Sequence, residues 1–453
     1  MNRYNPARGA VKAAACLLLV LGAGASHAID LLGAYEKALS VDPARLAADE
    51  AVAAGREKAR QGDAMLRPRL VLQASSTRLN NRASSDVSVP AAAIAPSESS
   101  GTASQAALQW SQPLYDQGAV ADKRQLHQQT ALAEIEYEHA RQDLMQRVAE
   151  AYFGVLLAQE SLRVTRAEQA AVALQRDRAQ ARFDVGRGRI TDLQEAQARL
   201  DAVQAKEVSA QSTLASAQAQ YAELTGLPAQ DLVGLGRFAP TPPMPDDLPS
   251  WQAKSAAANA GVRVKQTELV IASAEVGRYR LGSRPTLDLV ASYTAKQQSS
   301  GLSSAISPDG SRSAAIGLQF KLPLYTGGAL DSKERESLAR QRLAEQELSA
   351  ARRDARLRVQ DSYLSVKNGV ARIAALEQSL KSNQTALDAT TLGRDLGTRT
   401  ELDVLDAQQR VYTSQLELAQ ARHDYLLGRV RLARSAGELN ESDLRALNAY
   451  LVP

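Results

Sequence analysis

Two pairs of acidic residues have a spacing that suits ion binding. Asp403 and Asp406 are three residues apart, and Asp192 and Glu195 repeat that spacing 211 residues earlier. Residues three apart lie on one face of a helix, where two like charges repel modestly. Acids in the first turn of a helix also have a purely structural explanation, because they interact favourably with the helix dipole. Thr191 and Thr400, which precede the two pairs, are expected to cap these helices and so support that explanation. The sequence leaves two explanations open: helix stabilisation, or carboxylates gathered around the axis of an oligomer to select cations.

The rest of the chain offers little that could carry out catalysis. It contains no nucleophile elbow, Walker sequence or metalloprotease motif, and the Gly-Arg-Gly run at 186–188 is too short for a nucleotide-binding loop. The histidines without metal-ligand spacing, all expected to be solvated on helices, are His127, His139 and His423. The single cysteine, Cys16, lies in an N-terminal leader. We therefore predict a protein that is not an enzyme and that holds no cofactor or metal.

The first 28 residues have the layout of a secretory signal peptide. A basic segment with Arg3, Arg8 and Lys12 precedes an apolar run at 13–23, and small residues at 26–28 suit cleavage. The apolar run is short for a spanning helix, which disfavours a signal anchor. The chain has 54 Lys and Arg against 50 Asp and Glu, and the leader carries three of the four excess positive charges. Without it the charge is +1, which argues against bulk binding to nucleic acid.

The sequence after the leader contains a tandem duplication. A Pro-Leu-Tyr run at 113–115 returns at 323–325, and a constant offset of 211 residues relates Gly186 to Gly397 and the two acidic pairs to each other. Each copy is too long to be a solenoid repeat. The predicted divisions are repeats at 29–226 and 250–437, a Pro- and Gly-rich connector at 227–249, and a C-terminal tail at 438–453.

Each repeat is predicted to hold a helix, two strands, a long helix, a tip and a shorter helix. The long helices, about 118–182 and 328–394, lack proline. Some 65 residues at 1.5 Å each make a rod of roughly 100 Å. The helices after the tips, 191–225 and 400–435, carry apolar residues in alternate steps of three and four, which is the period of a coiled-coil seam. A helix at about 250–281 would stack end to end with a shorter helix, and the two would match one long helix in length.

Four segments alternate between apolar and polar residues. They lie at about 67–80, 104–115, 284–297 and 312–325, joined by loops at 80–103 and 298–311. Such alternation over about ten residues is typical of transmembrane β-strands, but also of a half-buried soluble sheet. The signal peptide favours the membrane alternative. Four strands are too few to close a barrel, so we predict an oligomer in which each chain contributes a sector.

The tips resemble those of the TolC family of outer-membrane exit ducts. The second tip carries the resemblance in the run 396–400 followed by 403–407, and the first tip in 185–186 followed by 190–192. The run 437–448 resembles the family as well. The resemblance implies an internally duplicated mixed membrane protein: a long antiparallel coiled-coil α-barrel and a transmembrane β-barrel sector of four strands per chain, shared in a homotrimer.

The same resemblance implies a function and partners. The protein would be an exit duct in the bacterial outer membrane with a large periplasmic portion. It would passively conduct drugs or proteins from an inner-membrane ABC, RND or MFS transporter. Its partners would be outer-membrane lipid and a periplasmic adaptor (membrane fusion) protein, with no nucleic acid. The adaptor-docking tips would be Val185, Gly186, Leu396, Gly397 and Thr398.

The resemblance also assigns roles to the acidic pairs. Asp403 and Asp406 match the family's carboxylate ring at the periplasmic entrance. Asp192 and Glu195 would be secondary acids of the lumen.

A latch is implied beside the ring. Arg399 matches the family's latch arginine, and Thr191 and Asp192 match its partners. A bond between an arginine and a carboxylate on two helix tips would keep the entrance closed until an adaptor competes for it. An ordinary exposed ion pair, worth about 0–1 kcal/mol, is the alternative. Arg394 stands where the family has a tyrosine, and we expect it to pair with Asp192.

Two other classes of protein remain as alternatives, a periplasmic adaptor and a coiled-coil scaffold without a pore. The adaptor alternative is disfavoured because the chain lacks lipoyl-like β domains. The amphipathic strands and the acidic pairs at the tips count against the scaffold.

Overall fold

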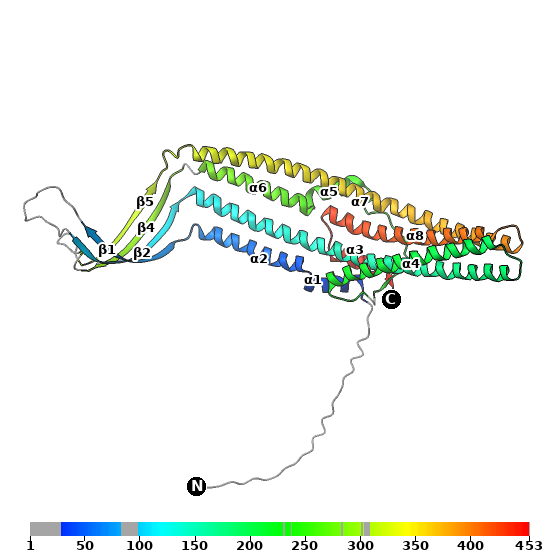
Figure 1. The fold of residues 1–453 in the computed structure, drawn as a ribbon. Helices are drawn as coiled ribbons and strands as arrows, with labels where there is room; N and C mark the ends of the chain where they lie inside the picture. Colours follow the sequence, from blue (N-terminus) through cyan, green and yellow to red (C-terminus); the bar gives the residue numbers. More distant parts are fainter. Residues whose placement is uncertain are drawn as a thin grey trace, which may run out of the picture.

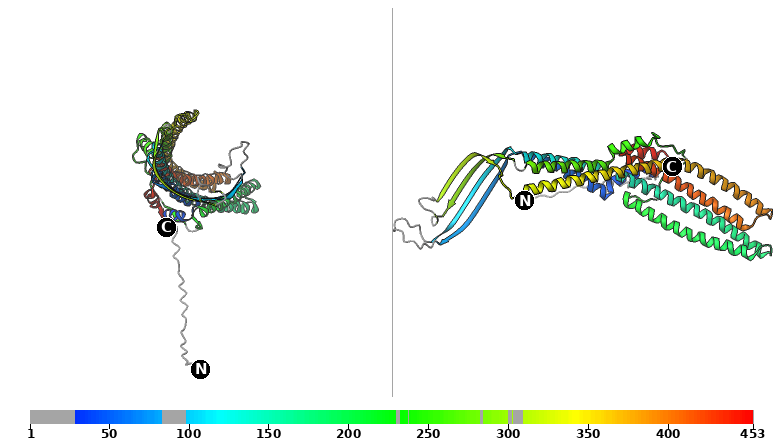
Figure 2. Two further views of the ribbon diagram at one scale, coloured as in Figure 1. Left: turned by 90° about the vertical axis from the view of Figure 1, so that its left-hand side faces the viewer. Right: turned by 90° about the horizontal axis from the view of Figure 1, so that it is seen from above.

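The computed structural model describes residues 29–82, 98–229, 232–236, 238–281, 284–299, 302 and 309–452. The predicted signal peptide at 1–28 lies outside the described residues. The molecule is elongated, with a sheet at one end and two helical hairpins reaching the other (Figure 1). Seen along its length, it curves into an open arc, and the C-terminus lies on the convex side (Figure 2).

Two continuous helices run most of the length of the helical part. They are α3 (Gln117–Asp184) and α7 (Ala329–Asp395), 68 and 67 residues long. Asp116 starts α3 because its side chain accepts a hydrogen bond from the Ala119 N–H. Shorter helices fill the spaces beside them: α2 (Pro43–Ala64), α4 (Ile190–Thr225), α6 (Ala260–Leu281) and α8 (Glu401–Ala436).

The 3.5-residue seam predicted for the second repeat is buried along the whole of α8. Its buried members are Val404, Ala407, Val411, Ser414, Leu418, Ala421, Tyr425, Gly428 and Leu432. The corresponding seam of α4 buries Leu193, Ala196, Leu200 and Val203 near the tip. The two hairpins α3–α4 and α7–α8 are thus held by coiled-coil packing.

The helix predicted at 250–281 is two helices in the structure. These are α5 (Leu248–Ala258) and α6, separated at Asn259, whose ψ of 123° is not helical. The Asn259 side chain accepts from the Val262 N–H at 3.2 Å, so asparagine starts the second helix as a cap does. The first repeat has a matching break, because Asp42 separates α1 (Leu31–Val41) from α2.

Four antiparallel strands form one sheet, in the order β1-β2-β4-β5. They are β1 (Arg69–Arg82), β2 (Glu98–Tyr115), β4 (Thr286–Gln298) and β5 (Gly310–Lys321). β2 starts earlier than predicted and β5 ends four residues sooner. The central pair β2–β4 joins the two repeats, with Trp110 opposite Ala291. The register places Leu72, Ile316 and Leu318 on one face, and they are 70, 76 and 66% exposed.

The short elements gather into a collar on the convex side of the arc. They are α1, α5, α9 (Glu441–Asn448) and the two-residue strands β3 (Gly234–Leu235) and β6 (Leu451–Val452). The strand pair β3–β6 binds the connector to the C-terminal tail. None of the helices in the described part of the chain has the length and apolar character that a bilayer crossing needs.

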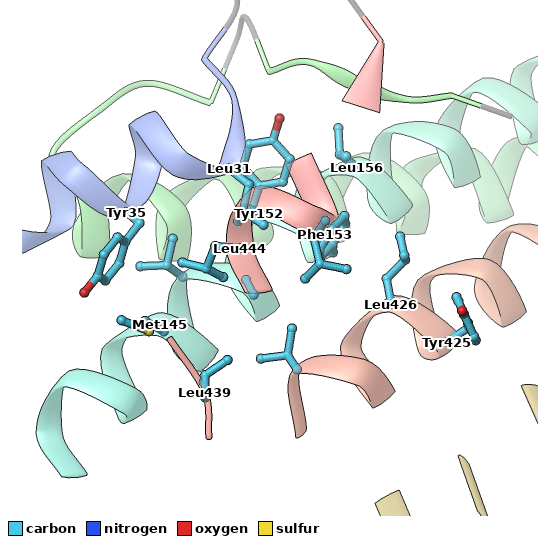
Figure 3. Packing of buried hydrophobic residues seen from close by; sticks show 14 of the residues in the cluster. Leu31, Tyr35, Met145, Tyr152, Phe153, Leu156, Tyr425, Leu426, Leu439 and Leu444 are labelled. Atoms are coloured by element: carbon cyan, nitrogen blue, oxygen red, sulfur yellow. The ribbon is translucent and has the colours of Figure 1, made fainter. Parts of the chain in front are cut away.

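The main hydrophobic core lies where this collar meets α3 and α8 (Figure 3). Tyr152 is fully buried at its centre, and its hydroxyl donates to the Val233 carbonyl at 2.9 Å.

His423, which we expected to be solvated, is only 4% exposed. Its ring stands edge-on to Phe153, and its Nδ1 bonds the Ala419 carbonyl at 2.8 Å. Burial lowers the pKa of His423 and so favours the neutral imidazole.

Asp42 is expected to contribute to the stability of the fold beside this core. It is 4% exposed, caps α2 through the Arg45 N–H at 2.9 Å, and accepts two bonds from Arg147 of α3 at 3.1 and 2.9 Å. We expect Asp42→Ala to lower the free energy of unfolding by about 3 kcal/mol, of which about 1 comes from the cap. Asp49→Ala, which removes a more exposed partner of Arg45, should cost about 0–1 kcal/mol.

The same variant has a predicted pH dependence. Hydrogen bonds from Arg147 hold the pKa of Asp42 below its usual value. A carboxyl with a lowered pKa stabilises the fold above its ordinary pKa, and that contribution is lost as the pH falls through the lowered value. Unfolding followed by circular dichroism should therefore show the deficit of Asp42→Ala at neutral pH and a smaller deficit in strong acid. A deficit that does not change with pH would contradict this assignment.

Candidate functional site at the hairpin tips

Both hairpins turn at the end of the molecule opposite the sheet, and the two turns have the same backbone structure (Figure 1). Gly186 and Gly397 have φ values of 72° and 78°, the left-handed conformation that suits glycine at the end of a helix. In each tip the residue after this glycine donates its N–H to a carbonyl five residues back, Arg187 to Arg182 and Thr398 to Gly393, both at 2.8 Å. The duplication in sequence is therefore also a duplication of the tip.

Asp403 has the structural role of a helix cap. It forms a capping box with Thr400: its carboxylate accepts from the Thr400 N–H and hydroxyl, both at 2.8 Å, while the Thr400 hydroxyl accepts from the Asp403 N–H. These bonds, together with the nearby charge of Arg399, hold the pKa of Asp403 below its usual value. The expected cap at Thr400 is confirmed, and it leaves Asp403 charged and without an ion pair among the described residues.

Asp406, one turn further along α8, is held by an ion pair. Arg199 of α4 donates to its carboxylate at 2.8 Å, which joins the second hairpin to the first. Its charge is thus partly compensated, unlike that of Asp403. The carboxylate is still half exposed.

The equivalent acids of the first tip have fewer interactions than Asp403 and Asp406. Asp192 lies in the first turn of α4, and neither it nor Glu195 makes a side-chain hydrogen bond or ion pair with any described residue. The expected cap at Thr191 is wrong. The helix begins at Ile190 with Arg189 in the capping position, so Thr191 is already inside it.

The predicted pairing of Arg394 with Asp192 is not formed within one chain. The Arg394 side chain is 6% exposed and donates to Glu401 at 3.3 Å, to Asp395 at 2.8 Å and to Gln175 at 3.3 Å. It turns inward because the buried carboxylate of Glu401 lies across the tip turn from it. Arg399 makes no side-chain hydrogen bond or ion pair within the described part of the chain, so its latch with Thr191 and Asp192 is not formed inside one chain.

Glu401 is a site residue that the sequence analysis missed. Its side chain is 6% exposed and receives Arg394 of α7 and Arg182 of α3, the latter at 3.1 Å. With Gln175 these residues form a network, here called the tip clamp, that ties the first hairpin to the second. The pairs Arg182–Glu401 and Gln175–Arg394 both span 219 residues, a separation that no local sequence motif marks. Glu401 alone looks like any acid in the first turn of a helix.

The residues expected to meet an adaptor are at the surface of the turns. Val185 and Leu396 are 69 and 72% exposed, and each precedes a left-handed glycine. A nearby cavity of about 470 Å³ lies between α3 and α7, lined in part by Leu174, Gln175 and Leu392. Within the described ranges, no cluster of His, Cys, Asp and Glu has the arrangement of a metal site.

Comparison with known proteins agrees with this arrangement. The family model for outer membrane efflux proteins matches residues 34–227 and 252–438, which are the two repeats without the connector. The chain belongs to the outer membrane efflux protein family. It is 33% identical over 348 residues to the outer membrane protein TolC of Vibrio cholerae, covering 76% of this chain and 79% of that one. It is also 32% identical over 431 residues to the alkaline protease secretion protein AprF of Pseudomonas aeruginosa, covering 94 and 88%.

The fold is shared with a solved outer membrane protein. The crystal structure of the outer membrane protein VceC from Vibrio cholerae has a TM-score of 0.73 and 21% identity, covering 90% of this chain and 96% of that one. The predicted TolC-family membership is confirmed, and with it the location in the outer membrane and the role as an exit duct for efflux. The family is one of channels, which sets aside the adaptor and the scaffold without a pore.

Proposed function

We propose that the chain forms a homotrimer in which three four-stranded sheets close one transmembrane β-barrel. The edge strands β1 and β5 lie on opposite sides of the sheet, and no described strand pairs with their outer edges. Unpaired edges invite pairing with another chain. Their exposed apolar side chains share one face, as a lipid-facing surface requires. The arc of the helices would likewise be one third of a periplasmic α-barrel (Figure 2).

This trimer would serve a tripartite system in drug efflux, type I protein secretion or both. The similarity to AprF, a protease secretion protein by name, supports secretion, and the family match supports efflux. An inner-membrane ABC, RND or MFS transporter would supply the energy. A periplasmic adaptor would dock at Val185, Gly186, Leu396, Gly397 and Thr398, because exposed apolar residues on paired turns suit a hydrophobic contact.

The entrance would lie at the tips. Threefold symmetry would place the carboxylates of Asp403 and Asp406 around the axis, where a ring of acids attracts cations. Asp192 and Glu195 would add a weaker field from the first tip. Arg399 would reach Thr191 and Asp192 of a neighbouring protomer, since it has no such partner in its own chain. The observation that supports this entrance most directly is the position of every predicted gate residue at the end opposite the sheet.

Conductance of the purified protein in a planar bilayer tests the proposal. We expect a small, cation-selective conductance from the wild-type trimer and a larger one from Arg399→Ser, because that variant removes the predicted contact between protomers. Arg352→Ser, on an exposed part of α7 away from the tips, is the matched control and should leave the current unchanged. A protein that inserts as a trimer but conducts in neither form would contradict the duct, and a monomer in native mass spectrometry would contradict the shared barrel.

A further inference from the structure

A second charged site lies at mid-length, far from the tips. The short helices α6 and α8 stand end to end between the continuous helices α3 and α7 (Figure 1). α8 ends at Ala436 and α6 begins at Ala260, so the layer has a junction where neither helix fills the space. A cavity of about 380 Å³ lies at this junction and is lined by all four helices. Its size falls in the usual range for small-ligand sites.

The charge of the lining is unbalanced. Arg358, Arg431 and Arg434 line the cavity, and Asp361 is the only acid among its lining residues. Amide and hydroxyl groups that can donate hydrogen bonds also line it, including those of Gln142, Asn259 and Ser362. A guanidinium group presents several donors in a fixed plane that matches the geometry of a carboxylate or phosphate.

Two of the arginines are held in place by acids of α3 that are not themselves in the lining. Arg431 pairs with Glu150 and Arg434 with Asp143, both at 2.8 Å. Arg434 also donates to the side-chain oxygen of Gln146 on α3 at 2.8 Å. Each of the two arginines still has N–H groups that these bonds to α3 do not use. Arg358 is exposed and makes no side-chain hydrogen bond or ion pair within the described part of the chain. The lining therefore combines two fixed guanidinium groups with one that is free to bind.

His139, which also lines the cavity, has a pKa below its usual value. The pKa of His139 is lowered, first by burial and then by the charge of Arg434, with a smaller contribution from Arg358. The nearby carboxylate of Asp143 acts in the opposite direction but does not offset these effects.

Arg431, which lines the cavity, lies on the side of α8 that faces away from the collar. Arg429 donates to the Tyr450 hydroxyl on the collar side at 2.8 Å. Arg431 is two residues further along α8, which turns it by about 200° to the opposite side of the helix. The collar lies on the convex side of the arc, so this opposite side is the concave one (Figure 2).

We propose that this cavity, the junction site, binds carboxylate groups. In the proposed trimer the concave side is the wall of the duct, and three junction sites would form a belt halfway along it. Carboxylates carried by a passing polypeptide, or by a small organic acid, would exchange water for the guanidinium groups there. The role in transit rests on the proposed function, whereas the binding itself does not.

Calorimetric titration of the detergent-purified protein at low ionic strength tests the junction site. The probes are citrate, for a small carboxylate, and a hexa-aspartate peptide, for a polypeptide. We expect at least one probe to bind, and Arg358→Gln to weaken its affinity at least tenfold. Arg358 is exposed, so this variant should fold normally, which circular dichroism will verify. The control Arg352→Gln removes an exposed charge from the same helix outside the cavity and should bind as the wild type does.

The outcomes separate this inference from the proposed duct, because the titration needs no conduction. The probe that loses affinity in Arg358→Gln identifies the source of the carboxylate. Binding of neither probe, or equal binding by wild type and Arg358→Gln, would overturn the junction site even if the protein conducts. Binding that depends on Arg358 in a protein that inserts but does not conduct would support the site and contradict the duct.

Discussion

Glu401→Gln is expected to open the entrance and raise the single-channel conductance several-fold. The substitution keeps the size of the side chain but removes the charge that Arg182 and Arg394 share. Arg394 is almost fully buried, so it would lose its only buried carboxylate partner among the described residues. Breaking a buried pair by removing one partner costs about 3–5 kcal/mol. The cost should fall on the tips, because the network lies between the two hairpins and away from the main core.

Two controls separate the tip clamp from a general loss of ion pairs. Glu207→Gln breaks a pair with Arg166 at 3.0 Å inside the first hairpin and should not change the conductance. In the double variant Arg394→Met/Glu401→Leu no buried charge remains unpaired at the turn, so much of the local stability should return. Hydrogen exchange at the tips, measured beside the conductance, should be faster in Glu401→Gln than in the double variant. Unchanged current and unchanged exchange in Glu401→Gln would refute the clamp.

Asp403→Asn is expected to relieve block by a trivalent cation added on the tip side more strongly than Asp406→Asn does. Asp403 has no ion pair among the described residues, whereas Asp406 is compensated by Arg199 at 2.8 Å. In a trimer each substitution removes three charges from the axis, and the uncompensated ones contribute more to the field. The double variant should lose at least about tenfold in affinity for the cation, or about 1.4 kcal/mol.

The pH dependence of the block provides an independent check. Because the pKa of Asp403 is lowered by its bonds to Thr400, the carboxylate stays charged below the pH at which an ordinary carboxyl gains a proton. Block of the wild type should persist in mild acid and disappear as the pH falls through that lowered pKa. Asp192→Asn/Glu195→Gln should reduce the block less than the Asp403 variant does. If it reduces the block more, the ring lies in the first tip.

The sequence was sufficient for the architecture because the architecture depends on periodicity. The absence of proline predicted the long helices to within two residues, and steps of three and four predicted the seam of α8. The sequence did not predict the break at Asn259, since one asparagine within a helical pattern does not by itself indicate that a helix ends and another begins. The start of β2 was misplaced because its polar residues at 98–103 look like loop residues, and the end of β5 because the apolar residues at 322–325 continue its alternation.

Only those interactions of the site that join residues close in sequence could be predicted. The cap at Thr400 is local, so its position just before the helix was enough to suggest it, whereas the reciprocal bond from Asp403 was seen only in the structure. The tip clamp joins residues 219 positions apart, and its central acid is recognisable only by its burial. Arg394 was assigned to Asp192 because the family pattern suggested that partner, whereas in the structure a nearer buried carboxylate binds it.

The order of the strands limits which fragments of this chain can survive. β2 and β4 are neighbours in the sheet, yet Tyr115 and Leu287, which face each other at the end of that pair, are 172 residues apart in the sequence. The chain must therefore be synthesised through β5, which ends at Lys321, before the sheet can form. A truncated product that stops in the connector would keep only β1 and β2, and a lone hairpin is marginally stable in water. Nonsense mutations in the connector, upstream of β4, should thus leave a secreted, degradable fragment and no partial pore.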